Sequence, residues 1–71
     1  MHTFNLEGSE FIELHNLLKV TGLIGSGGMA KSLIADGQVS VDSHLELRKR
    51  CKIRAGQWVE FAGEQIQVVD E

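Results

Sequence analysis

The most chemically distinctive stretch of this sequence is a short run in which five of seven residues are basic: Arg48, Lys49, Arg50, Lys52 and Arg54. We call residues 48–54 the basic strip. If the strip is an extended strand, its alternate side chains point to the same face. Four cations then stand in a row about 6.6 Å apart, while Ile53 points inward to a core. Because arginine offers paired donors to phosphate oxygens, this spacing predicts a surface that binds a polyanionic backbone.

A solvated strand edge is the alternative interpretation of the basic strip, since positive charge also deters aggregation of exposed edges. Edge protection rarely needs five charges in seven residues, however, and the chain as a whole carries a net charge of −3. All seven basic residues lie between Lys19 and Arg54, and the segments 1–18 and 59–71 are acidic. This uneven distribution favours polyanion binding, because charges more than about 10 Å away are screened at ordinary salt.

The segment Gly25-Ser26-Gly27-Gly28 is the second feature with possible chemistry. It lacks the Gly-x-x-x-x-Gly-Lys-Ser/Thr pattern of a nucleotide-binding phosphate loop. Ser26 is a good helix N-cap, so the segment is either a plain capping turn or a helix start whose amides contact an RNA phosphate. Gly27 and Gly28 each weaken the first turn by roughly 1 kcal/mol relative to alanine. That cost predicts a backbone that is crowded or that approaches another molecule closely.

The remaining reactive side chains form no recognisable catalytic or metal-binding set. The histidines His2, His15 and His44 have no metal-ligand spacing. Cys51 lies among cations, but the alternation of the strip points it inward, as a small buried hydrophobic residue. Trp58 is expected to be structural, and aromatic residues are too few for a single-strand stacking platform. We therefore predict no enzymatic activity, no metal, no cofactor and no small-molecule substrate.

Hydrophobic spacing and turn residues predict a single α+β domain over residues 1–71, with two helices packed on a small, mainly antiparallel sheet. One helix is expected over residues 9–20, with Ser9 as its N-cap and Gly22 as its stop. A second is expected from Ser26 to Gly37. The expected strands cover residues 3–6, 38–41, 58–61 and 65–69, with turns at 42–43, 55–57 and 62–64. The single cysteine and the absence of an apolar span or a secretory leader predict a cytoplasmic protein.

An ordered set of residues from Leu17 to Phe61 resembles the RNA-binding domain named after ribosomal small-subunit protein four, here called the S-four-like domain. The resemblance covers residues 9–69 nearly end to end and is specific only as a set. The matching residues are Leu17-Leu18-Lys19, Gly22-Leu23, Ser26, Ala30-Lys31, Leu33-Ile34, Gly37, Val39-Ser40-Val41-Asp42, Gly56 and Val59. The segments 26–28, 37–39 and 48–53 are similar to those of a group of small, stand-alone bacterial members.

The resemblance implies an arrangement of the two helices called αL, laid against a small antiparallel sheet, and binding to structured RNA. Family members usually carry basic residues at the start of the first helix and just after the serine cap, where this chain has Glu13 and Gly27. Asp42-Ser43 replaces the usual Asn-Gly turn, whereas Lys31 matches the basic position after alanine. The helical basic surface is therefore depleted, and the basic strip is expected to replace it.

These observations predict a non-enzymatic RNA-binding module that clamps the phosphate backbone with Arg48, Lys49, Arg50, Lys52 and Arg54. Lys19 and Lys31 are expected to border the same surface, and the backbone of residues 26–28 to approach a phosphate. RNA helices are recognised mostly by shape, so low sequence specificity is expected. The expected setting is the ribosome or an RNA-processing complex, with ribosomal, transfer and small regulatory RNA all open. The alternative is a protein-interaction module that docks the strip on an acidic partner.

Overall fold

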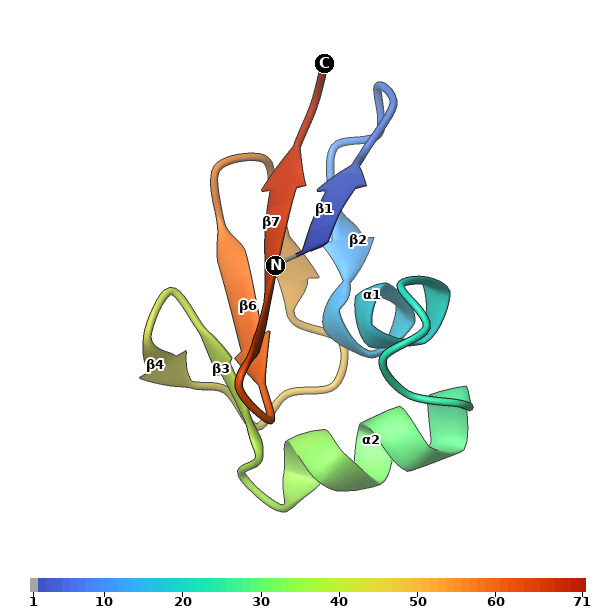
Figure 1. The fold of residues 1–71 in the computed structure, drawn as a ribbon, viewed down its shortest axis with the longest axis vertical. Helices are drawn as coiled ribbons and strands as arrows, with labels where there is room; N and C mark the ends of the chain where they lie inside the picture. Colours follow the sequence, from blue (N-terminus) through green and yellow to red (C-terminus); the bar gives the residue numbers. More distant parts are fainter. Residues whose placement is uncertain (1) are drawn as a thin grey trace.

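A computed structural model describes residues 2–71, which form two helices and seven short strands (Figure 1). The helices are α1 (Leu14–Val20) and α2 (Gly27–Ala35). The strands are β1 (His2–Asn5), β2 (Ile12–Glu13), β3 (Val39–Val41), β4 (His44–Leu45), β5 (Lys52–Ile53), β6 (Trp58–Phe61) and β7 (Glu64–Val69). None of the helices in residues 2–71 is long and apolar enough to cross a bilayer.

The main sheet has the strand order β1-β7-β6-β3-β4, and β2 and β5 form a separate antiparallel pair. Neighbouring strands of the main sheet are antiparallel, except that β1 and β7 run parallel to each other. In Figure 1, α1 is seen end-on beside the sheet and α2 lies across the view below it. The predicted class is therefore confirmed: this is an α+β fold with two helices and a mostly antiparallel, mixed sheet.

One hydrophobic core joins the helices to both sheets. Its fully buried members come from every layer: Leu14, Leu17, Leu18, Ala30, Ile34, Val39, Ile53, Val59 and Val68. The helical members recur at three- and four-residue spacing, and the strand members alternate, so each element buries one side. Ile53 matters most for the candidate site, because it is the fully buried residue near the end of the basic strip.

The second helix and the turn after it form as their local sequence predicts. The Ser26 hydroxyl accepts a hydrogen bond from the amide of Met29 at 3.1 Å, and Gly37 ends the helix with a φ of +78°. Asp42 and Ser43 both have positive φ, as a tight hairpin turn requires. The Asp42 carboxylate also accepts a hydrogen bond from the amide of Trp58 at 3.0 Å. That bond explains why aspartate suits this turn.

The predicted first helix is wrong over residues 9–13. Helix α1 begins only at Leu14, so Ser9 is not its N-cap, although its predicted end is confirmed at Gly22, where φ is +78°. Residues 12 and 13 instead form β2, with Ile12 opposite Ile53 and Glu13 opposite Lys52. The first amides of α1 are satisfied from outside the helix by the segment around β5. This tertiary pairing replaces the local capping that the sequence suggests.

Candidate nucleic-acid interface

The basic strip is fixed to the body of the protein by its backbone and by one buried side chain. The amides of Leu14 and His15, at the start of α1, donate to the carbonyl oxygens of Cys51 and Lys49 at 2.9 and 3.0 Å. Ile53 is fully buried opposite Ile12. The strip therefore caps α1 with its carbonyl groups while its charged side chains remain exposed.

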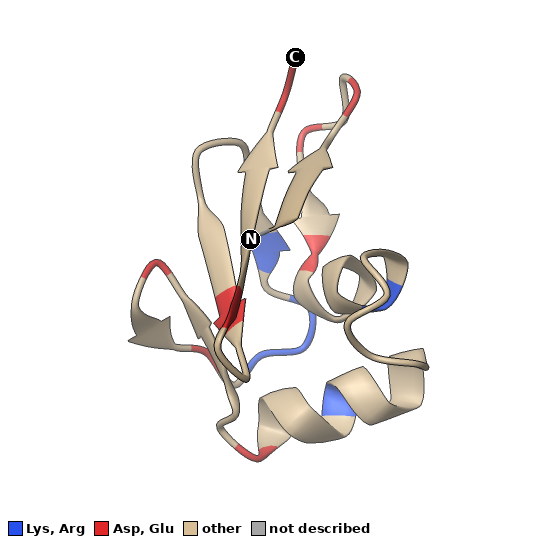
Figure 2. Ribbon diagram, in the orientation of Figure 1, with Lys and Arg blue, Asp and Glu red and all other residues tan. Residues whose placement is uncertain are grey.

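The strip is not the continuous strand that its alternation predicts. Only Lys52 and Ile53 are in a strand, and Lys49 and Arg50 form a turn closed by a hydrogen bond from the amide of Cys51 to the carbonyl of Arg48 at 3.1 Å. The turn lies between the two carbonyl groups, those of Lys49 and Cys51, that accept the first amides of α1. The cations consequently curve around a loop beside the helix, as the blue segments in Figure 2 show, rather than standing in a straight row.

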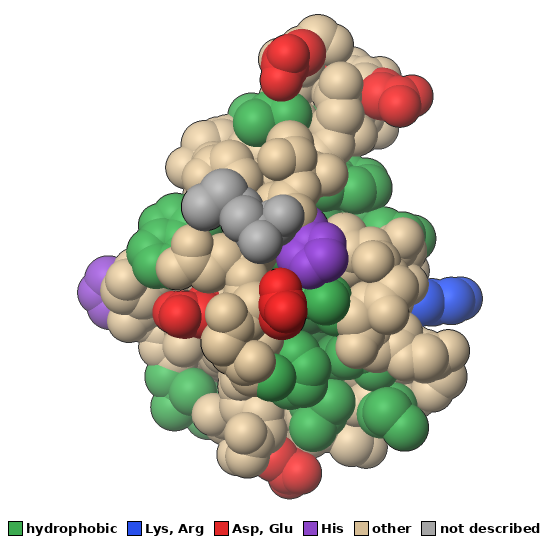
Figure 3. All heavy atoms as spheres, viewed as in Figure 1, with side chains coloured by type: hydrophobic (Ala, Val, Ile, Leu, Met, Phe, Trp, Pro, Cys, Tyr) green, Lys and Arg blue, Asp and Glu red, His purple; other side chains and the backbone are tan. Residues whose placement is uncertain are grey.

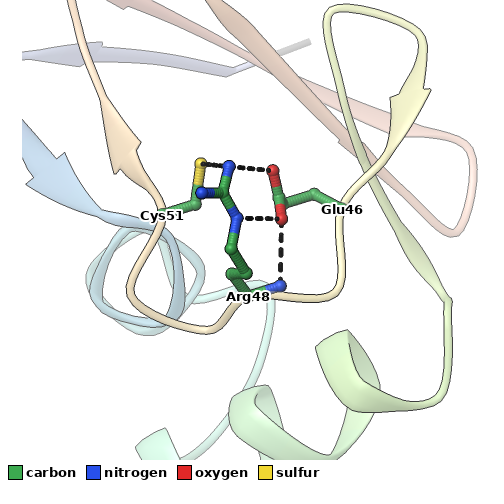
Figure 4. Close-up of polar contacts among 3 residues, drawn as sticks. All are labelled: Glu46, Arg48 and Cys51. Carbon is green, nitrogen blue, oxygen red and sulfur yellow. Dashed lines mark hydrogen bonds and ion pairs between the residues drawn. The ribbon is translucent and has the colours of Figure 1, made fainter.

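Arg48 at the start of the strip is held by an acidic partner, as Figure 4 shows. Its guanidinium donates to both carboxylate oxygens of Glu46, at 3.0 and 3.2 Å, and its amide donates to the same carboxylate at 3.0 Å. These bonds from Arg48 outweigh the partial burial of Glu46 and lower the pKa of its carboxyl group to about 2. Although the Arg48 side chain is 78% exposed, its charge is compensated.

Cys51 completes this cluster from the inner side of the loop. Its Sγ lies 4.0 Å from Nη2 of Arg48, and its side chain packs against the core. Burial raises the pKa of the Cys51 thiol, and the nearby Glu46 carboxylate raises it further. Cys51 thus packs toward the core as expected, but it is only partly buried rather than the fully buried residue that the alternation predicts. Glu46, Arg48 and Cys51 thus act as a clamp that shapes the first half of the strip.

The other four cations of the strip have no such partner. Within residues 2–71, no carboxylate oxygen lies within 4.0 Å of Lys49, Arg50, Lys52 or Arg54. All four side chains are exposed. Residues 48–52 line an open hollow of about 580 Å³. We call Lys49, Arg50, Lys52 and Arg54 the open cations. The first three line this hollow, and none of the four forms an ion pair within residues 2–71.

Phe11 is a neighbour of the strip that was not expected to be a site residue, because it lies within residues 9–20, where the sequence predicts a helix. Its ring lies under two of the open cations, with Lys52 Nζ 5.0 Å and Arg54 Cζ 5.7 Å from its centroid. The only signal for this placement is the pairing of β2 with β5. Two residues of strand carry too little pattern for that pairing to be read from the sequence.

The start of α2 meets the exposed side of α1. A Cβ built on Gly27 would lie 3.9 Å from Cδ of Lys19, and one on Gly28 would meet nothing within 4 Å. Crowding inside the molecule therefore does not explain these glycines. In the described part of the chain, neither glycine amide donates a hydrogen bond. Lys31 lies one turn further along α2 and is partly exposed.

The structure brings Lys19 close to Gly27, and α1 links both to the basic strip. His15 and Lys19 are four residues apart and so lie on one side of that helix, with the His15 amide bonded to the strip. Glu13 interrupts the basic character of this region. Its carboxylate pairs with His15 at 3.1 Å, and the residue stands opposite Lys52 in the β2–β5 pair.

The rest of the surface differs in character. The face drawn in Figure 3 is covered mainly by hydrophobic, acidic and neutral polar side chains, with almost no blue. His2 pairs with Glu64 at 3.1 Å. Residues 2–71 contain no group of three or more His, Cys, Asp or Glu side chains suited to a metal. Positive charge is therefore concentrated around the strip and the helices.

Comparisons with known proteins agree with this geometry. A family model described as S4 domain matches residues 4–69. The chain is 55% identical over 69 residues to YbcJ of Escherichia coli (strain K12) and to YbcJ of Shigella flexneri, covering 97% of this chain and 99% of each relative.

Two solved structures are also similar. The solution structure of YbcJ from E. coli, described as revealing an ALFAL motif involved in RNA-binding, has a TM-score of 0.76 and 55% identity, covering 97% of this chain and 87% of that one. The 30S ribosomal protein S4e from Thermoplasma acidophilum has a TM-score of 0.56 at 23% identity, over 73% of this chain and 26% of that one. The second likeness concerns the fold alone.

Proposed function

This chain belongs to the S4 domain family, and from that premise we propose that it binds structured RNA, without catalysis, through the open cations of its basic strip. The observation that carries the proposal is the group of four exposed, uncompensated cations held around one loop of an otherwise acidic protein. The RNA-binding ALFAL motif described for E. coli YbcJ supports both the RNA ligand and an αL arrangement of the two helices.

The proposed mechanism divides the strip into two parts. Lys49, Arg50, Lys52 and Arg54 contact phosphate oxygens of the RNA backbone. Arg48 fixes the loop through Glu46, so that its neighbours are in position before the RNA arrives. Neutralising four phosphates releases counterions, and log affinity should therefore fall against log salt with a slope of roughly −2.8 to −3.6.

A second group of contacts borders the strip on the helices. Lys19 and Lys31 add positive charge along α1 and α2, and the free amides of Gly27 and Gly28 stand at the helix start capped by Ser26. Amides at a helix N-terminus suit a phosphate, and glycine lets the RNA approach the backbone closely. Such a surface follows the shape of folded RNA rather than its sequence. We propose ribosomal or transfer RNA in the cytoplasm, at the ribosome or in an RNA-processing complex, as its setting.

Fluorescence anisotropy with a labelled RNA hairpin, measured at several salt concentrations, tests the proposal. The variant K49A/R50A/K52A should bind at least about tenfold more weakly, and the magnitude of its salt slope should be smaller by about three. The variant K49R/R50K/K52R is the matched control, because it changes the same side chains and keeps their charge. It should bind like the wild type.

Two results would contradict the proposal. Equal binding by the alanine variant would remove the strip from the interface. Absence of binding to ribosomal, transfer and hairpin RNA at low salt would instead favour a protein-interaction module that docks the strip on an acidic partner.

A further inference from the structure

The outward side of the β2–β5 pair combines an aromatic ring with cations. Ile12 and Ile53 face each other on the inner side, so the residues before and after them point outward. Extending this register by one residue places Phe11 opposite Arg54, next to the pair formed by Glu13 and Lys52. The cation distances of 5.0 and 5.7 Å to the Phe11 ring agree with this arrangement.

The Phe11 ring is not used to build the core. Phe4, Phe11 and Phe61 are all partly buried, but only Phe4 and Phe61 pack against the buried cluster. A phenyl ring outside the core has little reason to be beside phosphate-binding cations unless it contacts the cations, the ligand or both. Every nucleobase has a π-face that an aromatic ring can stack against.

We propose that Phe11 stacks against one unpaired nucleobase of the bound RNA. The exposed side chains of Lys52 and Arg54, which lie over the ring in the free protein, then leave it and hold the phosphates on the two sides of that base. This inference rests on the proposed function and deepens it, because it specifies the RNA: a helix interrupted by an unpaired nucleotide, such as a bulge. One ring accommodates one base, so the preference is for an isolated unpaired nucleotide rather than for a single-stranded tract.

The test compares two RNA hairpins that differ by one unpaired adenosine in the stem. By fluorescence anisotropy, the wild type should bind the bulged hairpin about 5- to 150-fold more tightly than the fully paired one, as expected for one base–aromatic contact. The F11L variant should lose this preference and keep the wild-type affinity for the paired hairpin. The F11W variant, which retains an aromatic face, should keep the preference.

The F61L variant is the matched control, because it makes the same change at a phenylalanine of the main sheet. It should leave both affinities unchanged. Thermal unfolding of each variant, followed by circular dichroism, identifies the temperature range in which all are folded.

The outcomes separate this inference from the proposed function. If the wild type binds both hairpins with equal, salt-dependent affinity, the stacking proposal is overturned. The proposed binding of phosphates by the open cations is then unaffected. A loss of affinity by F11L that is equal for both hairpins would also overturn the stacking proposal, because the ring would then only position Lys52 and Arg54. Absence of binding to either hairpin would overturn both proposals.

Discussion

The basic strip has two parts that carry the same kinds of side chain but differ in what surrounds them: its first residue, Arg48, and the open cations that follow. At its start, Arg48 is bound by both oxygens of Glu46 and lies next to Cys51. From Lys49 onward, the cations have no carboxylate within 4.0 Å in residues 2–71. Arg48 is nevertheless 78% exposed. Exposure alone therefore does not identify a phosphate contact, because the charge of an exposed arginine can already be compensated.

We infer from this difference that Arg48 and the open cations have different roles, one in shaping the loop and the other in binding. A bidentate arginine–carboxylate pair has a defined geometry, so it can hold a turn in shape. Unpaired cations keep their charge available for a polyanion, and a preformed loop lowers the entropy lost on binding. The clamp at Glu46 and the buried anchor at Ile53 are thus expected to govern stability, and the open cations to govern binding.

The largest expected effect is on stability, and it follows from truncating Ile53, the buried side chain that anchors the whole strip to the core. Ile53→Ala should lower the free energy of unfolding by about 2–5 kcal/mol, because it leaves a cavity in the core. The melting temperature should fall by more than about 10 °C. Ile53→Val, the matched control, should cost only about 0.5–1.5 kcal/mol. Thermal unfolding followed by circular dichroism measures both, and an I53A melting temperature equal to that of the wild type would show that Ile53 is not an anchor.

The next largest effect is on RNA affinity and concerns Glu13, the acidic residue beside the open cations. Glu13 stands opposite Lys52, so Glu13→Lys should remove a negative charge that repels RNA phosphates and add a cation. We expect affinity for a structured RNA to rise about tenfold and the salt slope to steepen by about one. Glu60→Lys, on β6 of the main sheet, changes the net charge equally and should have a much smaller effect. Equal gains by the two variants would indicate a response to net charge alone.

A smaller effect is expected from the clamp. Glu46→Gln should weaken the pair with Arg48 and lower the melting temperature at pH 7 by only a few °C, because solvent screens an ion pair whose arginine is exposed. Since the pKa of the Glu46 carboxyl is lowered from 4.5 to about 2 in the folded state, its contribution is full above about pH 4.5. That contribution is lost as the pH falls through about 2. The difference in melting temperature between wild type and E46Q should therefore shrink between pH 5 and 2, and a constant difference would contradict the clamp.

The contrast between the helices shows what could be predicted from the sequence. The limits of α2 were predicted because they depend on neighbouring residues: Ser26 caps its own helix and Gly37 ends it. The start of α1 was not, because its first amides are bound by Lys49 and Cys51, which lie far along the chain. Long-range pairing of this kind leaves no trace in local hydrophobic spacing.

The candidate site, like the helices, could be predicted from the sequence only in part. Charge density alone marked the basic strip, and the identity of its cations needs no structure. The role of each cation depends on contacts between segments. Glu46 separates Arg48 from its neighbours, and β2 brings Phe11 under Lys52 and Arg54. The sequence therefore located the surface but could not distinguish the residue that shapes it from those that are free to bind.

The most direct test of this division compares Arg48→Ala with Arg50→Ala in the same hairpin titration across salt concentrations. R50A should reduce the magnitude of the salt slope by about one, because it removes one phosphate contact, and should leave the melting temperature unchanged. R48A should lower the melting temperature and leave the slope unchanged when measured where the variant is folded. A reduction of the slope by R48A equal to that caused by R50A would contradict the account, since both arginines would then contact phosphate.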